Sequence, residues 1–493
     1  MILVYLFFIV LLFIIYVKRK HTYWKRRGLF QLEPEFFFGN SRREVTGKLS
    51  FAEGFLAKYK QFKALGLKHG GTYTFIEPVY IPIDPVIIKN ILVRDFWSFT
   101  GHGLYHHPSE PLSMHLFNLE GELWKQLRSK LTPTFTSGKI KMMFETLLEK
   151  VKDLEKVMDN CAENQEVINI KELGARFTTD VIASCAFGLE CNSLENPESE
   201  FRVFAKKVFA PQILRIFCIF LFPDWFLGLI RFKSIPKDVT EFFSKTVLDT
   251  IRFREESKFY RKDFMQLLLE LKNSNKEIGI QSISNDEIIA QCYLFFLAGF
   301  ETSSTTITFA FLELAQNQDV QDKLRSEILK VLERYNGEFS HEALMEMTYL
   351  DMIVNETLRL YPPLAFLPRI CNKTYKVPDT EVVIENGTRV NIPIWGLHKD
   401  PEYYPDPEKF NPENFSEENK AARPDFTYMP FGEGPRMCIG LRFGLLQTKL
   451  GIASLVRKYK FTLNERTKVP ISMESTNFLL SVDGDVCLNI NKI

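Results

Sequence analysis

The stretch FGEGPRMCIG, residues 431–440, surrounds a single cysteine with unusual backbone freedom. Two glycines and a proline stand in the six residues before Cys438, and a further glycine follows two residues after it. Glycine permits turns that other residues avoid and brings backbone N–H groups close to the sulfur. A helix is predicted over residues 440–457, and its positive N-terminal end is expected to stabilise a thiolate and to lower the pKa of Cys438.

Three interpretations of this stretch can be compared. A lone cysteine is usually a small buried hydrophobe. A glycine-rich loop can also cradle phosphate, but no G-K-[ST] follows and no strand is evident before it. A metal-bound thiolate explains more of the pattern, and Gly440 would let a flat macrocycle approach closely. One thiolate without a second soft ligand indicates haem iron, and not zinc or an iron–sulfur cluster.

The whole chain has an ordinary globular composition. It has 493 residues, of which 45% are hydrophobic, and a formal net charge of +1. This neutral balance implies no polyanionic partner, so nucleic acid is not expected. The eight cysteines show no paired spacing and no C-x-x-C, which argues against a disulfide framework or a zinc site and favours a reducing compartment.

The chain begins with an apolar segment, residues 1–17, that carries no charge. It spans roughly 25 Å as a helix, slightly less than the hydrocarbon core of a bilayer. A cleaved signal peptide would need positive residues before the segment and a small-residue cleavage site after it, but the positive residues, from Lys18 to Lys20, all follow it. We therefore predict an uncleaved anchor with a cytoplasmic protein body, and with Tyr16, Tyr23 and Trp24 near the membrane interface.

The rest of the chain predicts a mainly α fold with small β-sheets. Residues 18–45 form a basic, proline-containing linker, and residues 46–493 form one catalytic domain without repeats. Apolar spacing predicts helices over 138–158, 284–316 and 320–335, and strands within 70–83, 380–395 and 478–490. In the last of these, Asp483-Gly484 is a hairpin turn signal. A second apolar stretch, residues 213–222, is a core helix by default, with a membrane-dipping surface as the alternative.

The predicted helix over 284–316 opens with a capping box, Ser284 and Glu287, and carries polar residues at mid-length. Gly299 and the run from Glu301 to Thr306 interrupt an otherwise apolar helix. One interpretation is that the hydroxyls satisfy the backbone of a buried helix. The functional interpretation is a local opening in which Glu301 and Thr302 face something polar.

Two further pairs are weak signals when taken alone. Trp124 and Arg128 lie one helical turn apart, as in many surface cation–π pairs. Glu356 and Arg359 have the spacing of a common helix ion pair, and Arg369 follows beyond a Pro-Pro stop.

Taken in order, these segments resemble the cytochrome P450 superfamily of haem-thiolate monooxygenases. The resemblance rests on W-x-x-x-R at Trp124, A-G-x-E-T at 298–302, E-x-x-R at Glu356, and F-x-x-G-x-R-x-C-x-G at 431–440. Four motifs in the family's order and spacing are specific, and the likeness runs from the anchor to the C-terminus. Residues 131–144 and 298–306 are most similar to insect microsomal members that oxidise xenobiotics and endogenous lipids.

The resemblance implies the fold of that superfamily and a haem b cofactor with Cys438 as its axial ligand. It implies that the other cofactor-binding residues are Phe431, Arg436, Trp124, Arg128 and Arg369, the last four holding the haem propionates. Glu356 and Arg359 would brace the loop below the haem. The family usually completes this brace with an arginine, where this chain has Asn414.

The implied reaction inserts one atom of O2 into a hydrophobic small molecule, with Thr302 and Glu301 as the catalytic residues that deliver protons. The chain has no dinucleotide-binding fingerprint, so electrons from NADPH are expected through a separate NADPH–cytochrome reductase. The expected location is the endoplasmic reticulum membrane, in contact with lipid. Two alternatives are a haem-thiolate isomerase or dehydratase that acts on peroxides and a non-enzymatic haem sensor. The predicted pocket segments are 99–117, 209–220 and 362–368, which are apolar and aromatic.

Overall fold

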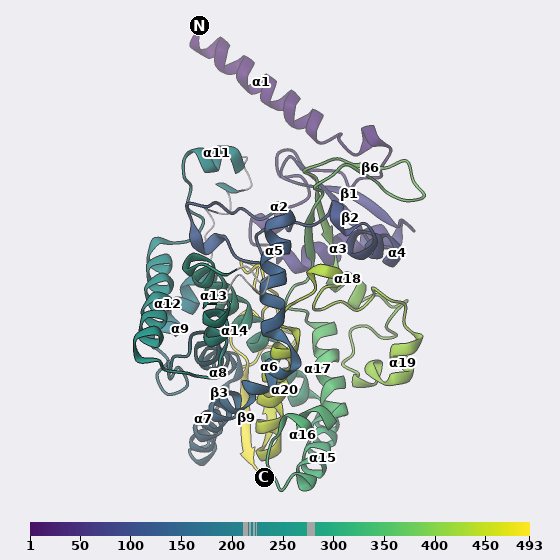
Figure 1. Ribbon diagram of the computed structural model, residues 1–493. Coiled ribbons are helices and arrows are strands. Elements are labelled where there is room, and N and C mark those ends of the chain that lie inside the picture. Colours follow the sequence, from purple (N-terminus) through teal and green to yellow (C-terminus); the bar gives the residue numbers. More distant parts are fainter. Residues whose placement is uncertain (211–214, 216–217, 220–221, 223, 274–281) are drawn as a thin grey trace.

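The computed structural model describes all residues except 211–214, 216–217, 220–221, 223 and 274–281. The interpretations of the apolar stretch 213–222 and of the pocket segment 209–220 therefore fall largely outside the described residues. The molecule is mainly helical, and most helices gather around a long central helix (Figure 1).

The helices follow one another along the chain as α1 (Ile2–Lys20), α2 (Arg42–Val45), α3 (Phe51–Ala64), α4 (Pro85–Lys89), α5 (Gly121–Leu131), α6 (Ser137–Met142), α7 (Phe144–Glu163), α8 (Ile170–Ile182), α9 (Glu200–Phe209), α11 (Asp224–Leu229), α12 (Lys237–Ser257), α13 (Phe264–Asn273), α14 (Asn285–Gln316), α15 (Gln318–Arg334), α16 (His341–Glu346), α17 (Thr348–Leu360), α18 (Ile394–His398), α19 (Glu417–Ala422) and α20 (Leu441–Lys458). The strands are β1 (His69–Thr74), β2 (Glu77–Pro82), β3 (Ile168–Asn169), β4 (Leu367–Ile370), β5 (Tyr375–Lys376), β6 (Val383–Ile384), β7 (Arg389–Ile392), β8 (Tyr459–Leu463) and β9 (Cys487–Lys492).

The central helix α14 confirms the helix predicted over residues 284–316. The Ser284 side chain accepts from the Glu287 N–H, and the Glu287 side chain accepts from the Ser284 N–H, which completes the capping box. At 1.5 Å per residue the helix is roughly 48 Å long. Most of its residues are buried, and α8 packs closely against it at Gly299, where an added Cβ would lie 2.4 Å from the Ile182 side chain.

The predicted opening in the middle of α14 is absent, because the helix is continuous from Asn285 to Gln316. Its hydroxyls donate to the carbonyls one turn earlier, from Thr302 to Ala298 O (2.7 Å) and from Thr308 to Ser304 O (2.7 Å). The polar run therefore satisfies backbone groups of a buried helix, as the alternative interpretation proposed.

The helix predicted over 138–158 is divided into two, α6 and α7, with the break at Met143. Met143 is buried, and it lines the same cavity as Ile140. All three of Ile140, Met143 and Phe144 are buried in the helical core. The helix predicted over 320–335 is confirmed as α15.

Three small sheets accompany the helices. The largest has the strand order β1-β2-β7-β4, in which β1 and β2 form an antiparallel hairpin and β2 pairs with β7 in parallel. A second sheet has the order β3-β9-β8, and β5 pairs with β6. The predicted strand regions 70–83 and 380–395 are thereby confirmed.

The hairpin predicted around Asp483-Gly484 is wrong. Val482 forms an isolated bridge with Met473, while β9 pairs with β8 along five residue pairs and with β3 on its other side. Gly484 does have a positive φ of 81°, so the turn signal is real. The two flanking segments nevertheless pair with other parts of the chain, because strand pairing depends on which apolar side chains can be buried and not on the turn alone.

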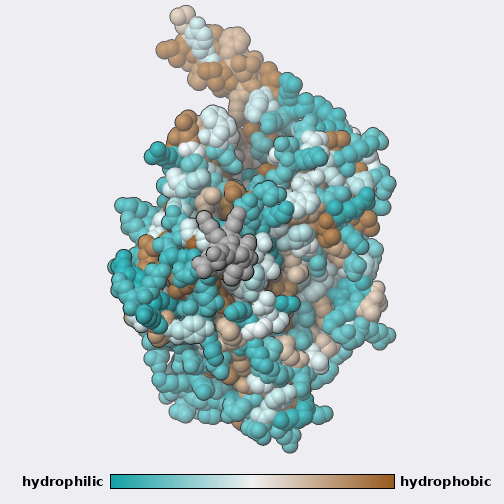
Figure 2. Space-filling model, viewed as in Figure 1, coloured by the Kyte–Doolittle hydropathy of each residue, from teal (hydrophilic) through white to brown (hydrophobic). Residues whose placement is uncertain are grey.

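The N-terminal helix α1 projects from one end of the molecule (Figure 1). By length and composition it is the one described helix apolar enough to cross a membrane, with a mean hydropathy of 2.4 and 6% of the apolar window buried. Figure 2 shows this apolar helix above a protein body whose visible face is mainly hydrophilic. The helix is therefore a candidate membrane anchor.

Trp24, predicted to lie near the membrane interface, is instead inside the protein. It has no exposed surface, its ring packs near Tyr80, and its Nε1 donates to Thr72 O (3.2 Å). An indole stacked against β1 and β2 is held by the apolar core of the large sheet. The segment after α1 is thus fastened to the protein body at this point.

Candidate active site

A cavity beside α14 and α20 brings together side chains from distant parts of the chain. Seven of the predicted site residues line it, namely Trp124, Arg128, Thr302, Arg369, Phe431, Arg436 and Cys438. Glu301 is not among its lining residues. Most of the remaining wall is apolar, with contributions from Leu116 and Phe117 and from Pro363, Leu364 and Leu367. The pocket segments predicted within 99–117 and 362–368 therefore contribute to the cavity.

The loop that carries Cys438 depends on its glycines. Gly432 and Gly434 have φ angles of 71° and 77°, in the left-handed region that other residues rarely adopt. A Cβ at Gly434 would also lie 2.1 Å from the carbonyl oxygen of Leu92. The loop closes when the Cys438 N–H donates to Phe431 O (2.9 Å). This geometry presents the thiol to the cavity just before α20 begins.

The pKa of Cys438 differs from the expected one. Burial in the surrounding protein raises the pKa of the thiol, and this effect outweighs the backbone N–H groups of Gly440 and Leu441 and the Arg128 cation, all of which lower it. The accessible surface of Cys438 faces the cavity that it lines. The end of α20 therefore assists the thiolate, but a bound metal ion is needed to deprotonate it fully.

Two arginines at the cavity are deeply buried and have no acidic partner among the described residues. Arg436 donates to the carbonyls of Phe117 (3.3 Å) and Leu119 and lies 4.6 Å from the Trp124 ring centroid. Arg369 donates to Pro368 O (2.8 Å). The Nε atom of each guanidinium is buried without a hydrogen-bond partner.

The electrostatics of these arginines indicate a missing anion. Burial lowers the pKa of Arg369 to about 10, and burial together with the neighbouring Arg369 cation lowers that of Arg436 to about 9. Desolvated cations with free donors are costly unless an anion accompanies them. Arg128 adds a third charge, and its Nη2 donates to Met437 O (2.9 Å) beside the thiol.

The residues present fit a haem group. A thiol at the cavity wall can bind iron, an apolar interior can hold a flat macrocycle, and the guanidinium groups of Arg369 and Arg436 can pair with its propionates. Trp124 supplies an aromatic face against Arg436 and is itself 4% exposed. The unsatisfied Nε atoms are the observation that makes this fit specific for an anionic group.

One residue of this group had no useful sequence signal. His102 is buried, its Nδ1 lies 2.7 Å from Phe117 O and 3.3 Å from Arg436 Nη1, and its ring lines the cavity. Burial and the two neighbouring arginines hold its pKa well below the usual range, so the ring is neutral. In the sequence it stands near three other histidines, His106, His107 and His115, and no spacing distinguishes it from them.

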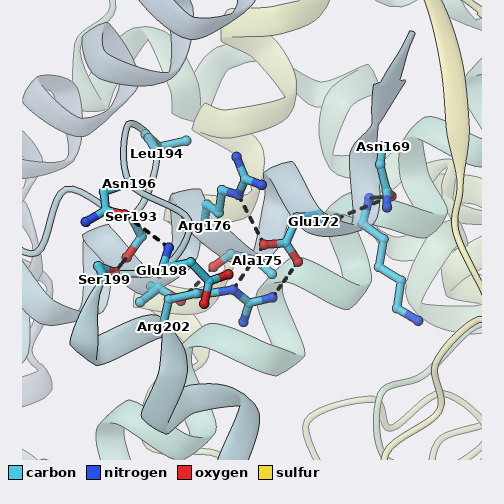
Figure 3. Close-up of polar contacts among 12 residues, drawn as sticks. Asn169, Glu172, Ala175, Arg176, Ser193, Leu194, Asn196, Glu198, Ser199 and Arg202 are labelled. Atoms are coloured by element: carbon cyan, nitrogen blue, oxygen red, sulfur yellow. Dashed lines mark hydrogen bonds and ion pairs between the residues drawn. The ribbon is translucent and has the colours of Figure 1, made fainter.

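Glu301 points to different surroundings from its neighbour Thr302. Burial raises the pKa of Glu301, while the charges of Arg202 and Lys171 lower it. Arg202 donates to Glu172 (2.8 Å), which also accepts from Arg176 (3.1 Å), so a polar cluster extends from α9 across α8 (Figure 3). Glu172 and Arg176 are partly exposed, which gives this cluster contact with solvent.

The predicted brace of Glu356 and Arg359 forms a fully buried ion pair, with Nε to Oε2 at 2.7 Å. Arg359 also donates to the carbonyls of His398, Pro407 and Lys409. Asn414 takes the third place in this brace, because its Nδ2 donates to Glu356 Oε1 (3.1 Å). The brace is therefore complete in hydrogen bonds, with an amide in place of a second cation.

Fold and site together define a class of protein: a mainly helical haem-thiolate protein with a largely apolar cavity lined by a cysteine. The family comparison agrees, since the cytochrome P450 family model matches residues 49–487. The chain belongs to the cytochrome P450 family.

Curated relatives are similar along nearly the whole chain. Cytochrome P450 6a2 of Drosophila melanogaster is 41% identical over 490 residues, which cover 96% of each chain. Probable cytochrome P450 6a23 of the same organism is 42% identical, with 98% of each chain covered. Cytochrome P450 6k1 of Blattella germanica is 40% identical, covering 97% of this chain and 94% of the relative. Family membership with insect relatives supports a haem-thiolate monooxygenase.

Proposed function

We propose that this protein is a membrane-anchored monooxygenase that inserts one oxygen atom from O2 into an uncharged, hydrophobic small molecule. The substrate is a xenobiotic or an endogenous lipid or hormone. Electrons come from NADPH through a separate NADPH–cytochrome reductase. The observation that carries the proposal is the cavity itself, in which Cys438 and Thr302 line the same apolar space.

In this proposal Cys438 would bind the iron of haem b, and Arg436, Arg369, Arg128 and Trp124 would hold the propionates. When bound, the haem supplies oxygen activation, which a thiolate ligand favours by donating electron density. Phe431 closes the loop through its carbonyl and lines the cavity beside the thiol.

Thr302 and Glu301 are proposed to manage protons. The Thr302 hydroxyl donates to Ala298 O (2.7 Å), and its oxygen remains able to accept a hydrogen bond from a water in the cavity. Glu301 lies outside the cavity lining and beside a cluster that reaches solvent. A raised pKa makes this carboxyl group a better proton carrier near neutral pH. Glu301 therefore takes protons from outside, and Thr302 holds the last water.

The wall of the cavity supports the substrate class. Among its described lining residues, the formal charges belong to Arg128, Arg369 and Arg436, which are assigned to the haem propionates. The rest of the wall is dominated by side chains such as Ile182, Leu294 and Phe295. A charged substrate would lose its hydration there without gaining a partner.

The location follows from α1 and the basic residues after it. Three cations, Lys18, Arg19 and Lys20, stand at the C-terminal end of the apolar helix. Positive residues after an apolar segment remain on the cytoplasmic side, so the protein body is proposed to lie in the cytoplasm at the endoplasmic reticulum membrane.

The test is a comparison of the wild type and Cys438→Ser as full-length, haem-loaded proteins. A neutral hydroxyl cannot replace the electron donation of sulfur, so the variant should lose the thiolate signature of the reduced CO complex. The wild type should form hydroxylated product only with O2, NADPH and reductase, after a screen for compounds that change the haem spin state. Product from a peroxide without NADPH would favour the isomerase, and ligand binding without turnover would favour the sensor.

A further inference from the structure

A loop over the cavity is fastened at one edge by a buried carboxylate. We call residues 102–117 the roof loop, because His102, Leu116 and Phe117 of this loop line the cavity. Its first part is held at His102, whose Nδ1 lies 3.3 Å from Arg436 Nη1, and its last part is tied to α14 and to Arg436. The Leu116 N–H donates to the buried Gln291 side chain of α14 (3.0 Å), and Arg436 donates to the carbonyl of Phe117 (3.3 Å).

The middle of the roof loop lies along the chain between α11 and α12. Tyr105 OH donates to Phe232 O (3.3 Å), and the two rings are 5.9 Å apart. Lys233 Nζ donates to the carbonyl of Ser109. A Cβ added at Gly228 would lie 3.3 Å from the His107 ring. We call this line of contact the seam, formed by residues 105–110 and 228–235.

Glu110 is the central fastening of the seam. It is 2% exposed, and it accepts from Ser234 Oγ (2.5 Å), Ser234 N (3.3 Å) and Ile235 N (3.0 Å). It forms no ion pair with any residue that the structure describes. All three of its donors belong to two neighbouring residues before α12, so one small displacement releases them together.

Such a fastening can open at modest cost. When the seam parts, water replaces each of the three donors, so the net loss per hydrogen bond is much smaller than its strength in the closed state. Apolar side chains that separate do not gain comparable bonds to water. The fixed ends of the roof loop and the releasable middle therefore make the seam the place where the wall of the cavity yields.

The position of the seam suits an apolar ligand. α11 lies at the end of the molecule from which α1 projects (Figure 1). On the same segment Trp225, Leu229 and Ile230 are exposed, at 72%, 74% and 54%. A compound dissolved in lipid would reach the protein at this end.

We propose that Glu110 is a positioning residue that controls how fast large apolar ligands reach the cavity, by holding the seam closed. This inference rests on the proposed function, since it takes the cavity as the ligand site. Glu110 does not touch the ligand or the haem. It should therefore govern rates of binding and release, not affinity, and it should matter for bulky ligands more than for small ones.

The experiment measures ligand-binding rates on the full-length, haem-loaded protein in lipid nanodiscs. The bulky probe is 4-phenylimidazole, followed by the absorbance change of the haem after rapid mixing. The small probe is CO, followed after flash photolysis of the reduced complex. The variants are Glu110→Gln, which keeps the size but removes the charge, and Ser234→Ala, which removes one of the three donors.

Glu327→Gln is the matched control. Glu327 also accepts from one hydroxyl and two neighbouring N–H groups, those of Thr348 (3.3 Å), Tyr349 (2.7 Å) and Leu350 (3.0 Å). It joins α15 to α17, away from the cavity lining. It reproduces the chemistry of Glu110 without its position on the roof loop.

For Glu110→Gln, the association and dissociation rates of 4-phenylimidazole should both rise about tenfold, with the Kd changed less than about twofold, as expected for loss of charge-assisted hydrogen bonds. Ser234→Ala should show the same pattern at about threefold, since one bond of three is lost. CO recombination and the Glu327→Gln rates should stay at the wild-type values.

The inference is overturned if Glu110→Gln keeps its haem and binds the bulky probe at the wild-type rate. It is also overturned if CO recombination in Glu110→Gln, or binding of the bulky probe to Glu327→Gln, accelerates as much as binding of the bulky probe to Glu110→Gln. The substitution would then have loosened the protein in general. If Glu110→Gln fails to hold haem, the test rests on Ser234→Ala alone. Faster binding and release of 4-phenylimidazole by this variant would support the inference, and wild-type rates would overturn it. Failure of the proposed haem site would be distinguishable from failure of this inference. In that case the wild type itself would show no absorbance change with either probe.

Discussion

Thr302 and Glu301 are neighbours in the sequence, yet each faces its own surroundings. Thr302 lines the cavity, whereas Glu301 is not among the lining residues and is influenced by the charges of Arg202 and Lys171. Consecutive residues of an α-helix are about 100° apart, so adjacent residues can serve two different compartments. This arrangement suits a relay in which one residue collects protons and the other delivers them.

Replacement of Thr302 should separate oxygen use from product formation. Thr302→Ala should keep its haem and the substrate-induced spectral change, because the hydroxyl donates only to the backbone of its own helix. NADPH should still be consumed, while product per NADPH falls by up to about 10²-fold, the lower end of the range for a lost acid–base effect, and hydrogen peroxide release rises. The measurement is product and peroxide per NADPH with one reconstituted reductase.

Two variants serve as controls for Thr302. Thr302→Ser keeps the hydroxyl and should retain much of the product yield. Thr308 makes the same bond to the carbonyl one turn earlier (2.7 Å) but does not line the cavity, so Thr308→Ala should leave the yield unchanged. Equal yields in the wild type and Thr302→Ala would mean that the polar run of α14 serves packing alone.

Glu301 carries a prediction about pH. Burial raises its pKa above the ordinary 4.5. Between 4.5 and the raised pKa the folded protein binds more protons than the unfolded chain, so the stability from this group is present at low pH and is lost as the pH rises. Glu301→Gln should remove this slope and raise the free energy of unfolding at pH 7, because a neutral amide avoids placing an ionised carboxylate in a buried environment.

The measurement is urea unfolding of the haem-loaded wild type and Glu301→Gln from pH 4.5 to 8. Glu313 offers a control, since burial raises its pKa as well, but it accepts from Tyr361 (2.6 Å) and does not line the cavity. Glu313→Gln should alter the pH profile of stability without lowering product per NADPH, whereas Glu301→Gln should alter both. Identical product yields in the wild type, Glu301→Gln and Glu313→Gln would show that Glu301 does not deliver protons to the reaction.

At the scale of elements, one buried ion pair on α17 binds several points of the chain between residues 398 and 414. Glu356 and Arg359 lie on α17, and between them they bond to His398, Pro407, Lys409, Asn411 and Asn414. A buried ion pair is tolerated when further hydrogen bonds satisfy both partners. Asn414 is one of these bonds, and Arg423 in turn donates to the Asn414 carbonyl (2.6 Å).

Asn414→Leu should weaken this brace, because Glu356 Oε1 loses one of its donors in a buried place. The free energy of unfolding should fall by about 1–3 kcal/mol, the range for an unsatisfied buried polar group, and haem should be lost faster. The measurements are the urea midpoint and the rate of haem transfer to apomyoglobin. Asn419→Ala, in the same region but exposed, removes a bond to Glu413 O (2.8 Å) and should change neither by a comparable amount.

At the scale of the whole molecule, the described residues form two large apolar cores and a small third one, and the candidate anchor helix is joined to one of the large cores. The helical core surrounds α14, and the sheet core includes Trp24, Tyr73 and Tyr80. Trp24 belongs to the sequence between the anchor and the domain, yet it lies inside the sheet core. The candidate anchor is therefore attached at a defined position, at the same end as the exposed apolar side chains of α11.

Deletion of residues 1–20 should leave a folded, haem-loaded protein that still binds membranes partly, through exposed Trp225 and Leu229. The measurement is flotation with lipid vesicles. In the truncated protein, Trp225→Ser with Leu229→Ser should abolish the remaining binding, while Trp97→Ser, which removes another exposed tryptophan elsewhere, should not. A truncated protein that stays wholly in the soluble fraction would contradict the second membrane contact.

A longer deletion separates anchoring from folding. Removal of residues 1–28 also removes Trp24, whose loss should cost about 3–5 kcal/mol of stability, the range for a buried tryptophan cut to alanine. The shorter deletion keeps this side chain and should unfold at the wild-type denaturant concentration.

The sequence by itself determined the helices with strong periodicity, the cap of α14, the anchor-like helix and the residues that meet at the cavity. These depend on local signals, such as apolar spacing and capping residues, or on motifs whose order along the chain is specific. The same local reasoning identified Cys438 as a residue presented by its glycines, and the φ angles of Gly432 and Gly434 bear this out.

The pairing of the strands and the surroundings of several side chains depend on tertiary contacts. The tertiary structure paired β9 with β8 in place of the predicted hairpin, drew Trp24 into the sheet core, kept α14 continuous and turned Glu301 away from the cavity. It also raised the pKa of Cys438, because burial by residues from α14, α20 and the loops between them outweighs one helix end. Local propensity fixes which backbone shapes are available, but burial and hydrogen bonding with residues hundreds of positions away decide which of them is used.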